Sequence, residues 1–289
     1  MLRTRTALAL VAPAVLLYAA LLLYPAVRGV ALSFTDARGV VGGRVVGLDN
    51  YRALLADPAV GAALRNTLLF TLVVVVAQNG VALLLAHWLH RVPSVRSLTR
   101  VALLVPSTTA VVVVGYVWAQ VYSPVGGPLD ALLGALGLDE LRRVWLGDPA
   151  TALPAIAVAT VWMYLGHATV IFLAGYLAVP TPVFEAAELD GARGWRRFWH
   201  VDWPLLAPAL TINVTLSVIG SLRVFDLPFV MTGGGPGDAT RTLSLLVYES
   251  SFRDYRFGYG TAVATALLGV TVAASLVITL VLRRREVTW

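Results

Sequence analysis

Six long apolar runs, separated by polar connections, dominate the hydropathy pattern of this 289-residue chain. The runs occupy approximately residues 8–32, 67–89, 101–122, 152–178, 205–227 and 260–282. A helix of about 20 apolar residues crosses a hydrocarbon layer of ~30 Å, and a helix satisfies all of its own backbone hydrogen bonds there. The pattern therefore predicts an all-α integral membrane protein with six transmembrane helices, organised as one domain over residues 1–289. The first run is too long for the core of a signal peptide and is predicted to be a retained span.

The composition excludes several function classes. Of all residues, 58% are hydrophobic and only 13% are charged, about half the charged share of an ordinary soluble domain. There is no cysteine, so neither a disulfide framework nor a thiolate nucleophile is available. No His-Glu-x-x-His pair, Gly-x-Ser-Gly segment or phosphate-binding Gly-Lys-Ser/Thr loop occurs. The chain is therefore predicted to be no enzyme, to bind no nucleic acid, and to hold no catalytic site, cofactor or metal of its own.

The net charge of +6 lies on one side of the predicted membrane. Eleven of the 22 arginines, but only five of the 16 acidic residues, fall before the first span, in the second and fourth connections, and after the sixth span. The remaining connections carry 11 arginines and 11 acidic residues, so their charges cancel. Because short cytoplasmic connections are enriched in basic residues, both termini and residues 181–204 are predicted to be cytoplasmic.

The connection at residues 181–204 is the one long polar segment between two apolar runs that is rich in both charges and aromatic rings. Thr181 and Pro182 are predicted to cap and start a short helix there. Gly191 is predicted to end that helix, because glycine adopts positive φ without steric cost. Pro204 then begins the next apolar run.

The same connection contains a spaced motif. Glu185-Ala186-Ala187 is followed after three residues by Gly191, and after nine more by Val201-Asp202-Trp203-Pro204. This arrangement resembles the Glu-Ala-Ala signature of permease subunits of ATP-driven (ABC) importers, except that Val201 and Trp203 replace isoleucine and leucine. The resemblance implies a coupling helix seated in a groove of an ATPase subunit. The implied coupling residues are Glu185, Ala186, Ala187, Asp190, Gly191 and Pro204.

Two outer segments resemble the carbohydrate-uptake branch of these importers, in particular the first permease of maltose-like and glycerol-phosphate-like systems. The matching residues are Ser33-Phe34-Thr35, Gly47-Leu48, Asn50-Tyr51 and Asn66-Thr67, and later Thr232-Gly233-Gly234-Gly235-Pro236, Tyr248-Glu249, Phe252 and Gly258-Tyr259. The resemblance implies a multi-pass protein of the bacterial cytoplasmic membrane. Its implied partners are a second homologous permease subunit, two ATP-binding cassette subunits that bind ATP and Mg, and an extracytoplasmic solute-binding protein.

Polar residues inside the apolar runs are the candidate substrate path, because a sugar requires hydroxyl or amide hydrogen bonds and an aromatic stacking face. The candidates are Gln120, Tyr164, His167, Asn213, Thr215 and Ser217, with Trp162 beside them. Asn213, Thr215 and Ser217 are predicted to lie on nearly one face of the fifth span. Each of these side chains can equally join neighbouring helices, which is a common use of small polar residues in membranes.

Three local structures are also predicted. Arg223 and Asp226 are three residues apart and are expected to pair along the outer end of the fifth span. Asn66 is expected to cap the second span. Residues 129–138 are expected to form a short helix on the outer surface.

The predicted function is the permease subunit of an ATP-driven importer for a sugar or oligosaccharide delivered by an extracytoplasmic binding protein. The energy must come from a partner, because the chain lacks an ATP-binding loop and its spans lack a series of acids for proton coupling. The first alternative is a permease of the same class for glycerol phosphate or another small polar solute. A stand-alone carrier or an intramembrane enzyme fits the sequence less well.

Overall fold

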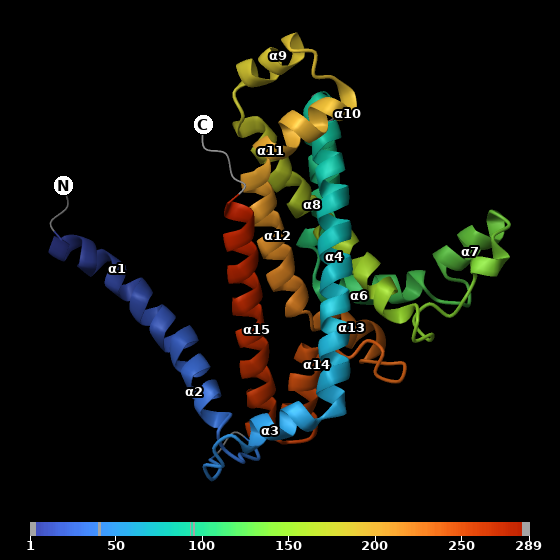
Figure 1. Ribbon diagram of the computed structural model, residues 1–289. Coiled ribbons are helices and arrows are strands. Elements are labelled where there is room, and N and C mark those ends of the chain that lie inside the picture. Colours follow the sequence, from blue (N-terminus) through green and yellow to red (C-terminus); the bar gives the residue numbers. More distant parts are fainter. Residues whose placement is uncertain (1–3, 40–41, 93, 95, 285–289) are drawn as a thin grey trace. The chain divides into compact units, whose positions relative to one another are not determined.

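The computed structural model describes residues 4–39, 42–92, 94 and 96–284, and helices account for nearly all of their regular structure (Figure 1). Four helices in this part are long and apolar enough to cross a membrane by themselves, and two bent helix pairs bring the number of candidate spans to six. The predicted all-α membrane fold is thereby confirmed. The chain divides into two compact units, one built from the residues up to Gly61 with Leu246–Leu268, the other from Ala62–Leu245 with the residues from Gly269 onward.

The first unit contains the N-terminal helices, and side-chain hydrogen bonds hold α3 to the end of α2. Its helical segments are α1 (Thr4–Tyr18), a π-helical turn (Ala19–Leu23), α2 (Tyr24–Leu32), α3 (Asp49–Ala56), and a π-helical turn at Glu249–Arg253. The Asn50 side chain donates to the carbonyls of Ser33 and Thr35, each at 2.8 Å, and the hydroxyls of Tyr51 and Ser33 lie 2.6 Å apart. The Asn50-Tyr51 motif therefore fastens α3 to the end of α2.

The remaining helices lie in the second unit or run into it. They are α4 (Pro58–Arg91), α5 (Arg96–Thr108), α6 (Val111–Val121), α7 (Pro128–Ala135), α8 (Ala152–Ala178), α9 (Thr181–Leu189), α10 (Gly194–Arg197), α11 (Trp203–Leu205), α12 (Ala207–Leu222), α13 (Asp226–Thr232), α14 (Leu243–Tyr248) and α15 (Phe257–Arg283). The short helix predicted at residues 129–138 corresponds to α7.

Helix α8 is the central helix of the second unit, and its bounds coincide with the predicted fourth span. Its small residues permit close helix packing, as expected where apolar burial alone does not bring helices together. A Cβ added at Gly166 would overlap the backbone of Leu103 in α5, and one added at Gly175 would lie 2.8 Å from the Cβ of Ala209 in α12. Figure 1 shows α9 and α10 at one end of this unit.

The predicted third span at residues 101–122 is wrong as one straight helix. It consists of two helices, α5 and α6, bent by 98°, and Ala110 between them has an extended ψ of 131°. Pro106 has no N–H to donate to the preceding turn, and the hydroxyls of Thr108 and Thr109 both donate to the carbonyl of Val105. These local bonds compete with the continuation of the helix.

The fifth span also differs from the prediction. Helix α12 ends at Leu222 and α13 begins at Asp226, so Arg223 and Asp226 do not share a helix. Within the described part of the chain, no hydrogen bond or ion pair joins these two side chains, and their predicted pairing is wrong. The predicted cap at Asn66 is wrong as well. Asn66 lies inside α4, and its amide donates to the carbonyls of Asp238 and Arg241.

Candidate functional site

The loop at residues 181–204 begins with α9, a nine-residue helix. Pro180 occupies the N-cap position with ψ of 134°, and Pro182 lies in the first turn, where a missing N–H leaves no partner unsatisfied. Thr181 is the first helical residue and makes no capping bond through its side chain, so its predicted capping role is wrong. Alanine and glutamate then favour the helix up to Leu189.

The end of α9 has the geometry that the sequence predicts. Gly191 adopts φ of 77°. Its N–H donates to the carbonyl of Glu188 at 3.1 Å, and the N–H of Ala192 donates to the carbonyl of Ala187 at 2.9 Å. This pair of bonds is the Schellman arrangement, which requires a left-handed residue after the helix. Gly191 therefore turns the chain away from α9.

Most of the α9 surface is free of contacts with the rest of the described chain. Phe184 is the helix's one buried side chain. Glu185, Ala186 and Asp190 are exposed, and Leu189 is 90% exposed. The exposed Leu189 and the exposed motif residues together form a surface that is partly apolar and partly acidic. Such a surface suits contact with another protein.

Behind α9 lies a buried ionic cluster. The carboxylate of Asp202 accepts from Arg197 Nε at 3.4 Å and lies 3.2 Å from Nδ1 of His87. Arg197 also donates to Glu188 at 2.5 Å, and Nδ1 of His87 lies 2.8 Å from the Tyr176 hydroxyl. Sequence reasoning assigned these side chains no role. Asp202 could have indicated a buried charge, because it is the one acidic residue in the largely aromatic and apolar segment from Phe198 to Trp203.

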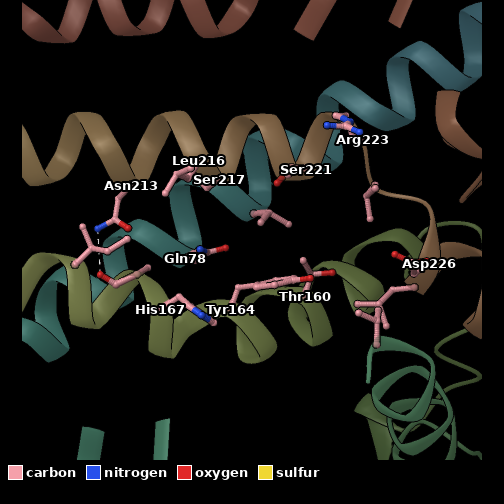
Figure 2. A pocket seen from close by; sticks show the side chains of 17 residues that line it. Gln78, Thr160, Tyr164, His167, Asn213, Leu216, Ser217, Ser221, Arg223 and Asp226 are labelled. Atoms are coloured by element: carbon pink, nitrogen blue, oxygen red, sulfur yellow. Dashed lines mark hydrogen bonds between the residues drawn. The ribbon is translucent and has the colours of Figure 1, made fainter. Parts of the chain in front are cut away.

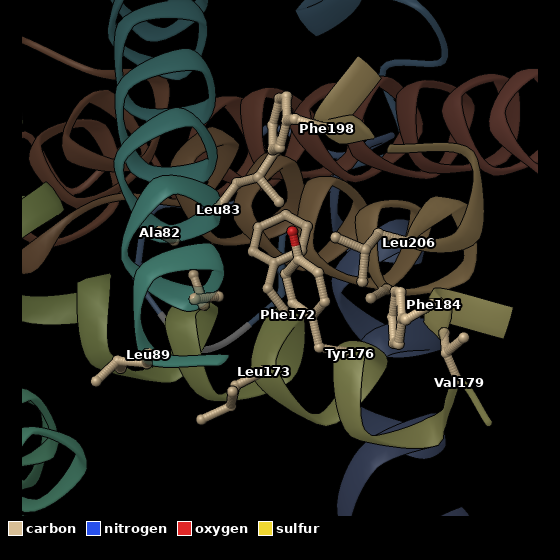
Figure 3. Close-up of a cluster of buried hydrophobic side chains, with 13 residues drawn as sticks. Ala82, Leu83, Leu89, Phe172, Leu173, Tyr176, Val179, Phe184, Phe198 and Leu206 are labelled. Carbon is tan, nitrogen blue, oxygen red and sulfur yellow. The ribbon is translucent and has the colours of Figure 1, made fainter. Parts of the chain in front are cut away.

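The rings and aliphatic side chains around this cluster form a hydrophobic core (Figure 3). Its residues come from α4, α8, α9 and α12 and from the π-helical turn at Phe198–Asp202. Phe172, Tyr176 and Leu206 are almost completely buried within it. The 181–204 loop is thus packed directly onto the ends of membrane helices.

A cavity of about 380 Å³ lies between α4, α8 and α12 (Figure 2). Its polar lining consists of Gln78, Thr160, Tyr164, His167, Asn213, Ser217, Ser221, Arg223 and Asp226. Four of the six predicted path residues, and both members of the predicted outer pair, are therefore brought together. Gln78, Thr160 and Ser221 were missed, because single polar residues in an apolar run do not reveal which face of the helix they occupy.

Two predicted path residues lie elsewhere. Gln120 is exposed near the end of α6 and does not line the cavity. The hydroxyl of Thr215 lies 3.2 Å from that of Thr279 in α15. Two residues along a helix turn by about 200°, so Thr215 points away from Asn213 and Ser217, which are four residues apart and do share a face. The predicted common face is wrong for Thr215.

The cavity walls include polar groups of two kinds. Asn213 donates to the carbonyl of Ala168 at 3.1 Å, and Ser217 accepts from Asn79 at 3.0 Å, so both tie helices together. Within the described residues, by contrast, no hydrogen-bond or ion-pair partner contacts the side chains of Gln78, Tyr164, His167, Arg223 and Asp226. Gln78 is only 8% exposed, so its amide groups can be satisfied only from the cavity.

These groups offer both hydrogen-bond donors and hydrogen-bond acceptors to one apolar-walled space. An amide, a phenol and an imidazole suit uncharged hydroxyls, and the Tyr164 ring offers a stacking face. The guanidinium of Arg223 and the carboxylate of Asp226 add opposite charges at one end. Among the described residues, no group of three metal-ligating side chains is present.

Comparison with known proteins assigns the chain to a group of transport proteins. The family model described as "Binding-protein-dependent transport system inner membrane component" matches residues 78–287. A probable ABC transporter permease protein of Pyrococcus horikoshii is 36% identical over 89% of this chain and 88% of its own length. The sulfoquinovosyl glycerol transport system permease of Agrobacterium fabrum is 30% identical over 97% and 91%. The sn-glycerol-3-phosphate transport system permease of Brucella abortus is 33% identical over 91% and 90%.

A solved structure has the same fold. A chain of a bacterial ABC transporter involved in the import of the acidic polysaccharide alginate superimposes with a TM-score of 0.82. The match covers 96% of this chain and 94% of the other, at 20% sequence identity.

Proposed function

The chain belongs to the family of inner membrane components of binding-protein-dependent transport systems, and from this premise we propose that its cavity conducts a sugar or an oligosaccharide. The chain is the permease subunit of an ABC importer, a transport component rather than an enzyme. The observation that carries the substrate proposal is a set of hydrogen-bonding groups on the cavity wall, Gln78, Tyr164 and His167, that have no hydrogen-bond partner among the described residues. A polyhydroxylated solute satisfies such groups without bringing a charge into the membrane.

The relatives agree with this substrate class. One of them is a multiple sugar-binding transport system permease of Streptococcus mutans. It is 30% identical over 84% of the present chain.

We further propose that α9 is the element that receives energy from a partner. Its exposed Glu185, Ala186, Leu189 and Asp190 offer a surface to an ATPase subunit. The excess of arginine on the same side of the predicted spans supports a cytoplasmic position for this loop and both termini. The proposed assembly contains a second homologous permease, two ATP-binding cassette subunits that hold ATP and Mg, and an extracytoplasmic solute-binding protein, in a bacterial cytoplasmic membrane.

Glycerol phosphate is the second candidate substrate. It is favoured by Arg223, which faces the cavity without an ion-pair partner among the described residues, and by the glycerol-3-phosphate permease among the relatives. A guanidinium is well suited to a phosphate. Asp226 in the same wall opposes an anion, which is why the sugar is preferred.

The test is uptake by the assembled transporter in lipid vesicles, with its binding protein and ATP, for labelled oligosaccharides and for glycerol 3-phosphate. Gln78→Leu removes a cavity amide at nearly constant volume and should raise the KM for the transported sugar about fivefold to tenfold, the worth of one hydrogen bond. Thr215→Val, outside the cavity, is the matched control. Uptake of glycerol phosphate alone, abolished by Arg223→Gln, would replace the sugar by the second candidate.

A further inference from the structure

A carboxylate buried behind α9 needs an explanation, because a charge removed from water is unfavourable unless it is compensated. The Asp202 side chain is 1% exposed. Its two oxygens lie against two different side chains: Oδ1 is 3.4 Å from Nε of Arg197, and Oδ2 is 3.2 Å from Nδ1 of His87. Arg197 is itself largely buried, with 11% of its side chain exposed.

Arg197 contacts α9 at two points. Its Nη1 donates to Glu188 at 2.5 Å, and its guanidinium lies 5.0 Å from the centre of the Phe184 ring. Phe184 and Glu188 are four residues apart and therefore lie on the same face of α9. Phe184 is the one side chain that α9 buries, and Arg197 contacts both this ring and Glu188, so it attaches α9 at a second point.

The other end of the cluster lies on two membrane helices. His87 belongs to α4 and Tyr176 to α8, and the His87 Nδ1 and the Tyr176 hydroxyl are 2.8 Å apart. The ring of His90, one turn further along α4, stacks on Tyr176 at 4.7 Å and lies 5.3 Å from Phe184. A continuous set of contacts thus joins α9 to α4 and α8.

The same two helices form the wall of the cavity. On α4, Gln78 lies nine residues from His87, and on α8, His167 lies nine residues from Tyr176. At 1.5 Å per residue, each separation is about 14 Å of helix. Both stretches are uninterrupted α-helix without proline, so each transmits displacement without a hinge.

We propose that Arg197 and Asp202 are positioning residues that make α9 move as one body with α4 and α8, so that a displacement of α9 by the ATPase reaches the cavity. Without them, α9 is held by one buried ring and tilts independently of the membrane helices. The inference rests on the proposed energy-receiving role of α9, but not on the identity of the solute.

The first experiment measures the movement directly and needs no solute. The chain contains no cysteine, so Val183→Cys on α9 and Val158→Cys on α8, both at exposed positions, give one pair of spin labels in the complete transporter. The distance distribution is expected to stay narrow and unchanged between the nucleotide-free and ATP-bound states. Arg197→Gln should broaden it, whereas Arg196→Gln, a matched control at an exposed neighbour, should not.

The second experiment measures solute imported per ATP hydrolysed in the same vesicles. Arg197→Gln should lower this ratio about tenfold, within the usual range of coupling between sites, with hydrolysis retained. Arg197→Lys should restore part of it. Glu188→Gln, at a side chain that is 59% exposed and so does not endanger folding, should lower it less.

Two results would overturn the inference. One is a parent distance that itself changes on ATP binding, which would mean that α9 does not move with α8. The other is an unchanged distribution and an unchanged ratio in both Arg197→Gln and Glu188→Gln. A wild-type transporter that imports none of the sugars while the distance results hold would refute only the proposed solute.

Discussion

Replacing Gly191 tests the geometry of the turn after α9. Gly191 has φ of 77°, and an added Cβ would meet no atom within 4 Å, so only the backbone conformation opposes a side chain. An L-residue in the left-handed region costs about 1–2 kcal/mol, which lowers the population of the native turn roughly 5- to 30-fold. Asparagine tolerates this region better than alanine, and a β-branched valine tolerates it least.

From fastest to slowest, the expected order of uptake rates is therefore the unchanged transporter, Gly191→Asn, Gly191→Ala and Gly191→Val. The assay is ATP-dependent uptake by the complete transporter, with membrane insertion of each variant measured by the amount of permease recovered in the membrane. Insertion should persist in all of them, because the strained residue lies in a loop outside the apolar runs. Gly80→Ala is the matched control, since Gly80 is also free of neighbours within 4 Å but lies inside α4.

Normal uptake by Gly191→Val would refute the reasoning, because it would show that the Schellman turn is not needed for coupling. An order of effects that follows side-chain volume instead of left-handed preference would also count against it. In that case a partner surface, rather than the backbone conformation, would limit the size of the residue.

Three further predictions concern other parts of the chain. Gly166→Ala places a methyl group against the backbone of Leu103, and overpacking of this kind costs about 1–3 kcal/mol. The melting temperature of the detergent-solubilised permease should therefore fall. An unchanged melting temperature would show that α5 is free to move away. Asn50→Ala leaves the carbonyls of Ser33 and Thr35 without their side-chain donor, which should destabilise this turn by about 1–3 kcal/mol. Faster proteolysis of the connection between α2 and α3 should follow. The pKa of Asp130 lies below its ordinary value of 3.8 because Arg142 donates two hydrogen bonds to it. The resulting stabilisation of α7 is present at pH values above 3.8 and is lost as the pH falls through the lowered pKa of Asp130. Hydrogen exchange in α7 should therefore accelerate only in strong acid. Arg142→Gln should remove this pH dependence.

Local signals in the sequence predicted a large part of the fold correctly. Length and hydropathy identified the helices, and α8 has the predicted bounds. The left-handed turn at Gly191 was also predictable, because few residues other than glycine adopt that conformation without strain. The break between α5 and α6 was not predicted, since proline is tolerated in many membrane helices and only the surroundings decide whether the helix bends.

The site was only partly predictable. Spacing along one helix placed Asn213 and Ser217 on the cavity, but Thr215 was assigned to the same face although it turns towards Thr279. Arg223 and Asp226 were expected to pair because α12 was expected to continue past Leu222. Their freedom in the cavity depends on where the helix ends.

The sequence by itself determined that this is a helical membrane permease, because apolar length and the Glu-Ala-Ala spacing are properties of the chain read in order. Only the tertiary structure decided which polar groups share the cavity and which are used to hold helices together. It also decided that Asp202, Arg197 and His87 meet behind α9. The reason is that these contacts join residues from separate helices, and whether a polar group is satisfied depends on its neighbours in space and not on its neighbours along the chain.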